Sequence, residues 1–352
     1  MRISIPVRTW ALLAVALTWL ASGTAVRADE LDVLKGRTVR AVIGASPGNA
    51  TDSALRIFLG TLRKILPDTT FRIQNINAAG GAAALRDVQD SRGDVITVVG
   101  ISNGPIYAHF TADEVPYNLA SLKWIGSIND NQRVLFARKG AATTFAALRT
   151  LGRQPIAPAS DATSVSTQES YLISAMTGIR LKVVPGISDA VRDTMFVSGD
   201  VDVLSSNPAA RRAMVDAGIL VPVLRLGDGA YSDEVNRLPK LGDVALPTVP
   251  ADLVFFMESL NRLGGLVAAA PATAASDVAA LRVAFDRVVA HPDFKSETVA
   301  TMQVLGQPAP GAHTEDIFRR LLADNGSRLK SIVKGHLTCG QKISDAPSTV
   351  CP

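Results

Sequence analysis

One stretch near the amino end of the chain, residues 38–66, constrains the fold most. It reads TVRAVIGASPGNATDSALRIFLGTLRKIL, and its β-branched run at 39–43 leads through a loop of small and polar residues into an apolar-periodic segment from about Asp52. This order predicts a strand, a loop and a helix. The first N–H groups of such a helix lack internal partners, and the helix dipole adds partial positive charge. The loop is therefore suited to hold an anion.

Three later segments, 95–103, 156–164 and 201–207, repeat the pattern of an apolar strand that ends in small polar residues. None of these segments carries a nucleophile paired with a base, or a cluster of metal ligands. The four histidines have neither metal-ligand nor catalytic spacing. The sequence therefore predicts a protein that binds a small acid without transforming it, and it predicts no metal and no cofactor.

Residues 1–28 have the features of a cleavable export signal. Arg2 and Arg8 precede an apolar run at 10–20, and Val-Arg-Ala at 26–28 provides a cleavage site with a small final residue. The run is short for a membrane span, no second long run follows, and no cysteine lies near the cleavage site to carry a lipid. We therefore expect an exported, periplasmic protein without a membrane anchor.

The charge of the chain does not indicate a nucleic-acid partner. The formal charge is +4, but the leader contributes Arg2, Arg8 and Arg27 and no acidic residue, so most of this charge belongs to the leader. The remaining basic residues are scattered, and aromatic residues make up only 5% of the chain. Binding to nucleic acid is therefore not expected.

The two cysteines, Cys339 and Cys351, both lie at the carboxyl end. In an oxidising compartment they are expected to form a disulfide that holds the tail. Metal binding is the weaker alternative, because a structural metal takes four ligands and only His336 lies nearby.

Strand-like and helix-like segments alternate along most of the chain, which predicts an α/β fold with parallel-dominated sheets flanked by helices. Strands are predicted at 38–44, 70–76, 95–100, 124–128, 134–138, 156–158, 181–185, 201–204, 220–226 and 263–269. Helices are predicted at 53–65, 79–90, 144–151, 166–176, 188–198, 208–217, 275–289, 293–305 and 314–333.

The length of the chain, 352 residues, favours two hydrophobic cores. We expect a discontinuous first lobe, residues 29–128 and 262–352, with a second lobe at 129–261 inserted into it. The crossings are expected near 128–133 and 254–264. Two lobes joined in this way predict a hinged cleft that is lined by the loops at the carboxyl ends of the strands.

Polar loops of the first lobe supply most of the candidate ligand contacts. Helix capping by Asn49, Thr51 or Asp52 and ordinary turns are the alternative readings of these loops. The glycine spacing after the second strand does not match a dinucleotide-binding motif. The first-lobe candidates are Ser46, Gly48, Asn49, Thr51, Asp52, Ala79, Gly80, Ser102 and Asn103.

A hydroxyl-rich loop and two further strand ends supply the candidates of the second lobe. These candidates are Ser160, Thr163, Ser164, Asp189 and Asn207. For Asp189, capping of the following helix is the better reading, because an acid disfavours a bound anion. Four arginines could include one carboxylate clamp, and a solvated surface position is the favoured alternative for each: Arg133, Arg138, Arg211 and Arg212.

Several motifs, taken in order, resemble the extracytoplasmic receptors of tripartite tricarboxylate transporters, which are also called Bug receptors. They are VRAVIGASPGNATD, QNINAAGG, VPYNLASLKWIGSI, VVPGISDAVRDTMFVSGDVDVLSSN and AALRVAFDRVVAHPDF. The resemblance covers nearly the whole chain after the leader. Where the family has glycines in the first loop, this chain has Asn49 and Ala50, and Ala78 and Ala79 replace a Gly-Ala pair, so the site is narrower.

The resemblance implies a two-lobe periplasmic-binding-protein (Venus flytrap) fold without catalysis. It also implies a small organic acid ligand held by loops of both lobes, membrane permease subunits of a tripartite transporter as partners, and a monomeric receptor. Two other functions stay open from the residues. One is a periplasmic sensor that feeds a membrane kinase. The other is an exported hydrolase using Ser102 or Ser164, which lacks support because neither serine lies in a Gly-x-Ser-x-Gly motif.

Overall fold

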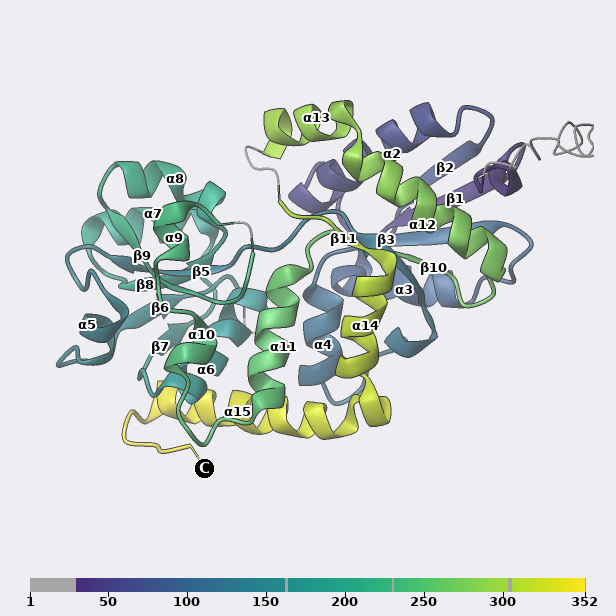
Figure 1. Ribbon diagram of the computed structural model, residues 1–352. Helices are drawn as coiled ribbons and strands as arrows, with labels where there is room; N and C mark the ends of the chain where they lie inside the picture. The colour runs from purple at the N-terminus through teal and green to yellow at the C-terminus, as the bar shows by residue number, and fades with distance from the viewer. Residues whose placement is uncertain (1–29, 162–163, 230, 303–305, 352) are drawn as a thin grey trace, which may run out of the picture.

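The computed structural model describes residues 30–161, 164–229, 231–302 and 306–351, so the predicted export signal lies outside the described residues. Two α/β lobes lie side by side (Figure 1). In the described part of the chain, no helix combines the length and apolar character that a membrane span requires. The two-lobe α/β fold predicted from the sequence is therefore confirmed.

The first lobe is built on a six-stranded sheet with the order β11-β4-β10-β3-β1-β2. Its strands are β1 (Thr38–Ile43), β2 (Thr70–Asn75), β3 (Ile96–Ile101), β4 (Lys123–Ser127), β10 (Leu266–Ala269) and β11 (Ala309–Pro310). Its helices include α2 (Ala50–Ile65), α3 (Ala82–Gln89), α4 (Gly104–Thr111), α12 (Ala275–Ala290), α13 (Pro292–Met302) and α14 (Gly311–Leu321). Strand β3 is buried at every position, as expected for a central strand covered on both faces.

The second lobe contains a three-stranded sheet, β8-β5-β9, and a two-stranded sheet, β6-β7. Its strands are β5 (Val134–Arg138), β6 (Ile156–Pro158), β7 (Lys182–Val184), β8 (Val203–Ser206) and β9 (Leu220–Arg225). Its helices are α5 (Phe145–Arg149), α6 (Val165–Thr177), α7 (Asp189–Ser198), α8 (Pro208–Asp216), α9 (Asp233–Asn236) and α10 (Leu241–Val244). Helix α11 (Ala251–Arg262) then leads back toward the first lobe.

Both lobes contain antiparallel as well as parallel strand pairs, and the sequence pattern did not indicate the antiparallel ones. Strand β1 is parallel to β2 and β3, and β6 is parallel to β7, as expected. Strand β5 is antiparallel to both of its neighbours, and so is β10. Each of these two strands is the first after the chain passes between lobes. It therefore enters its sheet at the edge where the neighbouring strands end.

Two predicted features of the carboxyl-terminal third are wrong. The segment 314–333, predicted as one helix, is divided between α14 and α15 (Ser327–Asp345), because Asp324 and Gly326 take positive φ angles of 52° and 72°. Helix α11 was not predicted, although Pro250 precedes a segment whose buried residues have helical spacing.

Helix α15 packs against both lobes. It lies along α6 and also contacts α4 (Figure 1). Near its start, Lys330 Nζ donates to Asp113 O at 2.7 Å. Near its end, Ser344 Oγ accepts from Val183 N at 3.0 Å. The predicted disulfide is confirmed: Cys339 and Cys351 are bonded, which ties the tail to α15.

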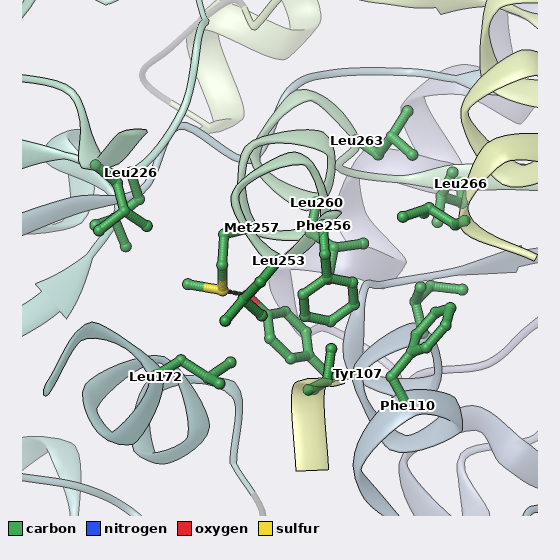
Figure 2. Close-up of a cluster of buried hydrophobic side chains, with 14 of the residues drawn as sticks. Tyr107, Phe110, Leu172, Leu226, Leu253, Phe256, Met257, Leu260, Leu263 and Leu266 are labelled. Carbon is green, nitrogen blue, oxygen red and sulfur yellow. Dashed lines mark hydrogen bonds between the residues drawn. The ribbon is translucent and has the colours of Figure 1, made fainter. Parts of the chain in front are cut away.

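We call the four helices α4, α6, α11 and α15 the base of the molecule. Each of the four contributes buried apolar side chains to one hydrophobic cluster that continues from one lobe into the other (Figure 2). Tyr107 and Phe110 of α4 pack edge-to-face on Phe256 of α11, with ring centroids 5.5 and 5.1 Å apart. Leu172 of α6 is fully buried in the same cluster. A large apolar contact of this kind restricts the relative motion of the lobes.

Candidate functional site

A cavity of about 500 Å³ lies where the two lobes meet, at the carboxyl ends of the first-lobe strands. The residues that surround it come from the start of α2, the loop after β3, the crossing between β4 and β5, the start of α8, and α13. Its polar lining residues are Thr51, Ser53, Ser102, Asn103, Asn129, Asp130, Asn131, Gln132, Asn207, Thr298 and Thr301. Phe294, Met302 and Ile128 add an apolar part.

The loop before α2 is held in shape by the buried carboxylate of Asp52. Its oxygens accept from Gly48 N at 2.8 Å, from Arg56 Nε at 2.8 and 3.0 Å, and from Asn75 Nδ2 at 2.7 Å. Burial raises the pKa of Asp52, but the hydrogen bonds from Arg56, Asn75 and Gly48 outweigh it, so the pKa lies below its ordinary value. Asn49 Oδ1 accepts from Asp52 N at 2.8 Å and caps the helix.

This arrangement leaves two N–H groups of the first turn of α2 available to a ligand. In the described structure, the N–H groups of Ala50 and Thr51 donate to no protein acceptor. Both residues line the cavity. A carboxylate at this position would accept both N–H groups at the positive end of a 16-residue helix.

The loops after β1 and β2 lie next to each other at the same edge of the sheet. Asn77 Nδ2 donates to Ser46 Oγ at 2.9 Å. Ala79 and Gly80 are exposed and have φ angles of 51° and 63°. A Cβ added to Gly81 would lie 2.8 Å from a backbone oxygen of the first loop, so only glycine permits this approach.

The loop after β3 contributes one hydroxyl and one structural amide. Ser102 lines the cavity, and its Oγ accepts from Gly104 N at 3.4 Å. Asn103 is only 5% exposed, and its Nδ2 donates to Leu260 O at 2.6 Å and to Leu263 O at 2.5 Å. The amide of Asn103 therefore connects the first lobe to the end of α11.

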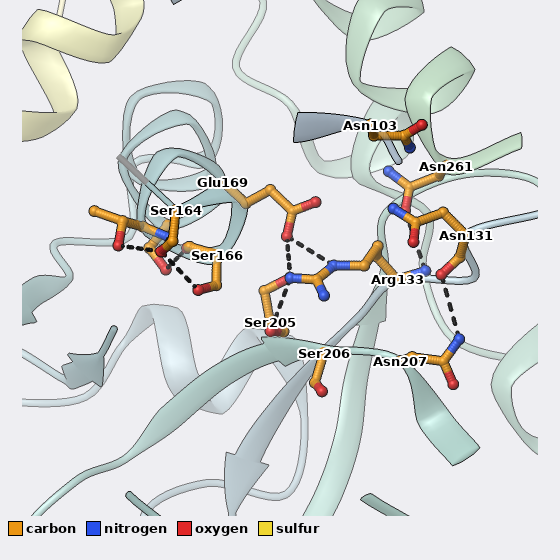
Figure 3. Close-up of polar contacts among 12 residues, drawn as sticks. Asn103, Asn131, Arg133, Ser164, Ser166, Glu169, Ser205, Ser206, Asn207 and Asn261 are labelled. Atoms are coloured by element: carbon orange, nitrogen blue, oxygen red, sulfur yellow. Dashed lines mark hydrogen bonds and ion pairs between the residues drawn. The ribbon is translucent and has the colours of Figure 1, made fainter. Parts of the chain in front are cut away.

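The crossing between β4 and β5 supplies a run of cavity residues, Asn129–Asp130–Asn131–Gln132, which were not predicted as site residues. The backbone of Gln132 has φ 40°, and its Nε2 donates to Asp130 Oδ1 at 3.0 Å. Asn207 Nδ2 donates to Asn131 O at 3.4 Å, which joins the crossing to the second lobe (Figure 3). Four consecutive polar residues after a buried strand were the available sequence signal.

The described residues of the hydroxyl-rich loop of the second lobe, 160–161 and 164–166, do not line the cavity in this conformation. Ser164 caps α6, because its Oγ accepts from Thr167 N at 3.4 Å, and Ser160 is exposed. Thr163 lies outside the described residues, and Asp189 begins α7 with a side chain that is not described. The structure thus brings Gly48, Thr51, Ser102, Asn103 and Asn207 of the candidates to the cavity.

Each arginine considered as a carboxylate clamp is paired with a carboxylate of the protein. Arg133 Nη2 lies 2.6 Å from Glu169 Oε2, as Figure 3 shows. The corresponding pairs are Arg138–Asp202 at 3.2 Å, Arg211–Asp193 at 2.5 Å and Arg212–Asp216 at 2.8 Å. Among the described residues, the cavity lining includes no Lys, Arg or His, and Asp130 is its charged residue. An anion bound here is therefore recognised by N–H, amide and hydroxyl groups.

No protein-family model matches the sequence, and no curated protein matches it. Solved structures do match. A ligand-free TctC solute binding protein from Polaromonas is 15% identical, with 86% of this chain and 98% of that chain covered and a TM-score of 0.67. A Rhodopseudomonas palustris protein with adipate is 20% identical, with 86% and 97% covered and a TM-score of 0.60.

A third similar structure is MatC from Rhodopseudomonas palustris with bound malate. It is 19% identical, with 84% of this chain and 99% of that chain covered and a TM-score of 0.57. At these identities the three likenesses establish the fold. The chain therefore shares its two-lobe fold with these three proteins over nearly the full length of each.

Proposed function

We propose that the protein is an extracytoplasmic receptor of the tripartite tricarboxylate transporter type, which captures a small carboxylate-bearing metabolite in the periplasm. The monomeric receptor then delivers its ligand to membrane permease subunits. The observation that carries the proposal is the cavity between the lobes, where the N–H groups of Ala50 and Thr51 are available at the amino end of α2. The malate and adipate held by two proteins of the same fold support a carboxylate as the ligand.

The chemistry of capture follows from the donors around the cavity. A carboxylate at the start of α2 accepts the N–H groups of Ala50 and Thr51, and the hydroxyl-bearing residues Thr51 and Ser102 line the same cavity. Each hydrogen bond to a charged acceptor contributes about 1.5–3 kcal/mol. Closure of the cleft brings the loop around Ser164 toward the ligand and removes water, which strengthens these bonds.

We propose no catalytic step. In the described structure, the hydrogen-bond partner of Ser102 Oγ is a backbone N–H group, and Ser164 Oγ bonds to Asp161 O, Ser166 and Thr167. Within the part of the chain that the structure describes, neither serine is hydrogen-bonded to a histidine that would remove its proton.

Isothermal titration of the refolded, ligand-free protein against mono-, di- and tricarboxylic acids tests the proposal. At least one acid should bind, and Thr51→Val should weaken its binding about tenfold, since one hydrogen bond to a charged group is lost. Thr150→Val is the matched control, because Thr150 is exposed directly after α5 and does not line the cavity. Absence of binding by the whole panel, or equal weakening by both variants, would contradict the proposed site.

A further inference from the structure

The base lies on the opposite side of the crossing segments from the cavity. In Figure 1, α13 and α8 flank the upper side of the junction, whereas α15 runs along its lower side beneath α4, α11 and α6. The residues 128–132 and 264–265 of the two crossings line the cavity. The crossings therefore separate the face that takes the ligand from the base.

A buried polar contact joins the lobes within the base. The hydroxyl of Tyr107 on α4 donates to Glu169 Oε1 on α6 at 3.2 Å. Tyr107 is 1% exposed and Glu169 is 0% exposed, so water does not compete for this bond. Its length already lies beyond the usual range for an O–H···O bond, and a small separation of the two helices would break it.

The same carboxylate is connected to the cavity through the first crossing. Glu169 Oε2 accepts from Arg133 Nε at 2.9 Å and from Ser205 Oγ at 2.5 Å. Arg133 directly follows the cavity residues Asn131 and Gln132, and its backbone N–H donates to Asn261 Oδ1 at 3.1 Å. A movement of the first crossing therefore moves Arg133, which is bonded to the same carboxylate that accepts from Tyr107.

We propose that the base opposes closure of the cleft, and that the Tyr107–Glu169 bond is a positioning contact that favours the open form. If the lobes rotate about the crossings so that the cavity closes, the helices on the opposite side must move apart. The open form is the one seen here, because Ser160 and Ser164 of the second lobe do not reach the cavity. The inference rests on the proposed function only in taking closure to be the ligand-binding motion.

Pulsed dipolar spectroscopy of the ligand-free protein tests the inference directly. Spin labels are attached at Val197→Cys on α7 and Val299→Cys on α13, which are exposed by 68% and 49% and belong to different lobes. The native cysteines are bonded to each other, so they do not take the label. In this background Tyr107→Phe should increase the fraction of short interlobe distances by about three- to tenfold, since a bond present only in the open form is removed.

Tyr117→Phe is the matched control. Tyr117 is also buried, but its hydroxyl donates to Pro105 O at 2.6 Å, and both residues precede the first crossing. This variant loses a buried hydroxyl of the same kind and should leave the interlobe distances unchanged. An unchanged distribution in Tyr107→Phe, or an equal shift in both variants, would overturn the inference.

The two proposals fail separately. If no acid binds but Tyr107→Phe still shifts the distances, the proposed function is wrong and the role of the base stands. If an acid binds, Tyr107→Phe should also bind it about three- to tenfold more tightly, because less of the protein has to be moved out of the open form. Unchanged affinity together with unchanged distances removes the inference and leaves the proposed function intact.

Discussion

The two faces of the junction between the lobes are built from different kinds of residue. The face toward the cavity has small polar residues and, in the described structure, N–H groups that donate to no protein acceptor, such as those of Ala50 and Thr51. The base has Tyr107, Phe110 and Phe256 in edge-to-face contact and almost completely buried. If both proposals hold, ligand recognition and restraint of the lobes lie on opposite sides of the crossings. Substitutions on the cavity face should act through contacts with the ligand, and substitutions in the base should act through stability and the balance between the open and closed forms.

The largest effect is expected from Glu169→Ala. This substitution leaves Arg133 without the carboxylate that it contacts at 2.6 Å, in a position where its side chain is only 15% exposed. Breaking a buried ion pair by removing one partner lowers the free energy of unfolding by about 3–5 kcal/mol. Urea unfolding measures the change.

The control for this prediction is Asp216→Ala, which removes the partner of Arg212 on the surface of α8. Both side chains of that pair are more than half exposed, at 57% and 77%. Exposed pairs of this kind contribute little to stability, and no measurable change is expected. Similar losses of unfolding free energy in both variants would show that the buried Arg133–Glu169 pair stabilises the junction no more than an exposed pair stabilises α8.

The next largest effect is expected in the contact of α15 with α6. A Cβ added to Gly340 would lie 2.1 Å from the carbonyl oxygen of Tyr171, so Gly340→Ala should push the two helices apart and lower the free energy of unfolding by about 1–3 kcal/mol. Gly335→Ala, on the same helix, meets no atom within 4 Å and should stabilise the protein by up to about 1 kcal/mol. Thermal unfolding of both variants separates packing from helix propensity.

The sequence predicted the segments that have a clear local pattern and failed where the result depends on how the two lobes are joined. Strands at 134–138 and 156–158 were predicted with the bounds that the structure has, because β-branched and apolar runs there end at turn residues. The direction of β5 was not predictable, since it depends on which sheet edge the crossing reaches. Helix α11 was missed because its apolar residues were interpreted as part of a crossing.

The candidate site was predicted in part, for a physical reason that differs between residues. Residues at the ends of parallel strands, such as Thr51 and Ser102, were found because such ends share one edge of a sheet. Asn129 and Gln132 were missed because a crossing has no periodic pattern that marks its position. The buried role of Asn103 depends on carbonyl groups about 160 residues away, and no local pattern shows it.

A smaller effect on stability and a larger one on binding are expected from Ser102→Ala on the cavity face. The hydroxyl lines the cavity and has only a 3.4 Å bond to Gly104 N, so the free energy of unfolding should change by less than about 0.5 kcal/mol. Affinity for the bound acid should fall about five- to tenfold, since one donor is lost. Titration and unfolding of the same preparation measure both. A loss of stability without a loss of affinity would contradict the assignment of Ser102 to ligand binding rather than to structure.

The smallest effect on stability is expected when the pH is lowered, and it should act first on the loop that Asp52 holds at the cavity. The hydrogen bonds of Asp52 lower its folded pKa, so its contribution to stability is present above the unfolded pKa of about 3.9 and is lost as the pH falls through the folded value. Burial raises the pKa of Tyr107 well above its ordinary value, so the hydroxyl of the base stays protonated throughout this range. Urea midpoints measured from about pH 7 to about pH 3, which is roughly three units above to one unit below the ordinary carboxyl pKa, should fall less steeply in Asp52→Asn than in the unchanged protein. Parallel curves for the two proteins would mean that this carboxylate does not hold the loop in which Ala50 and Thr51 present their N–H groups.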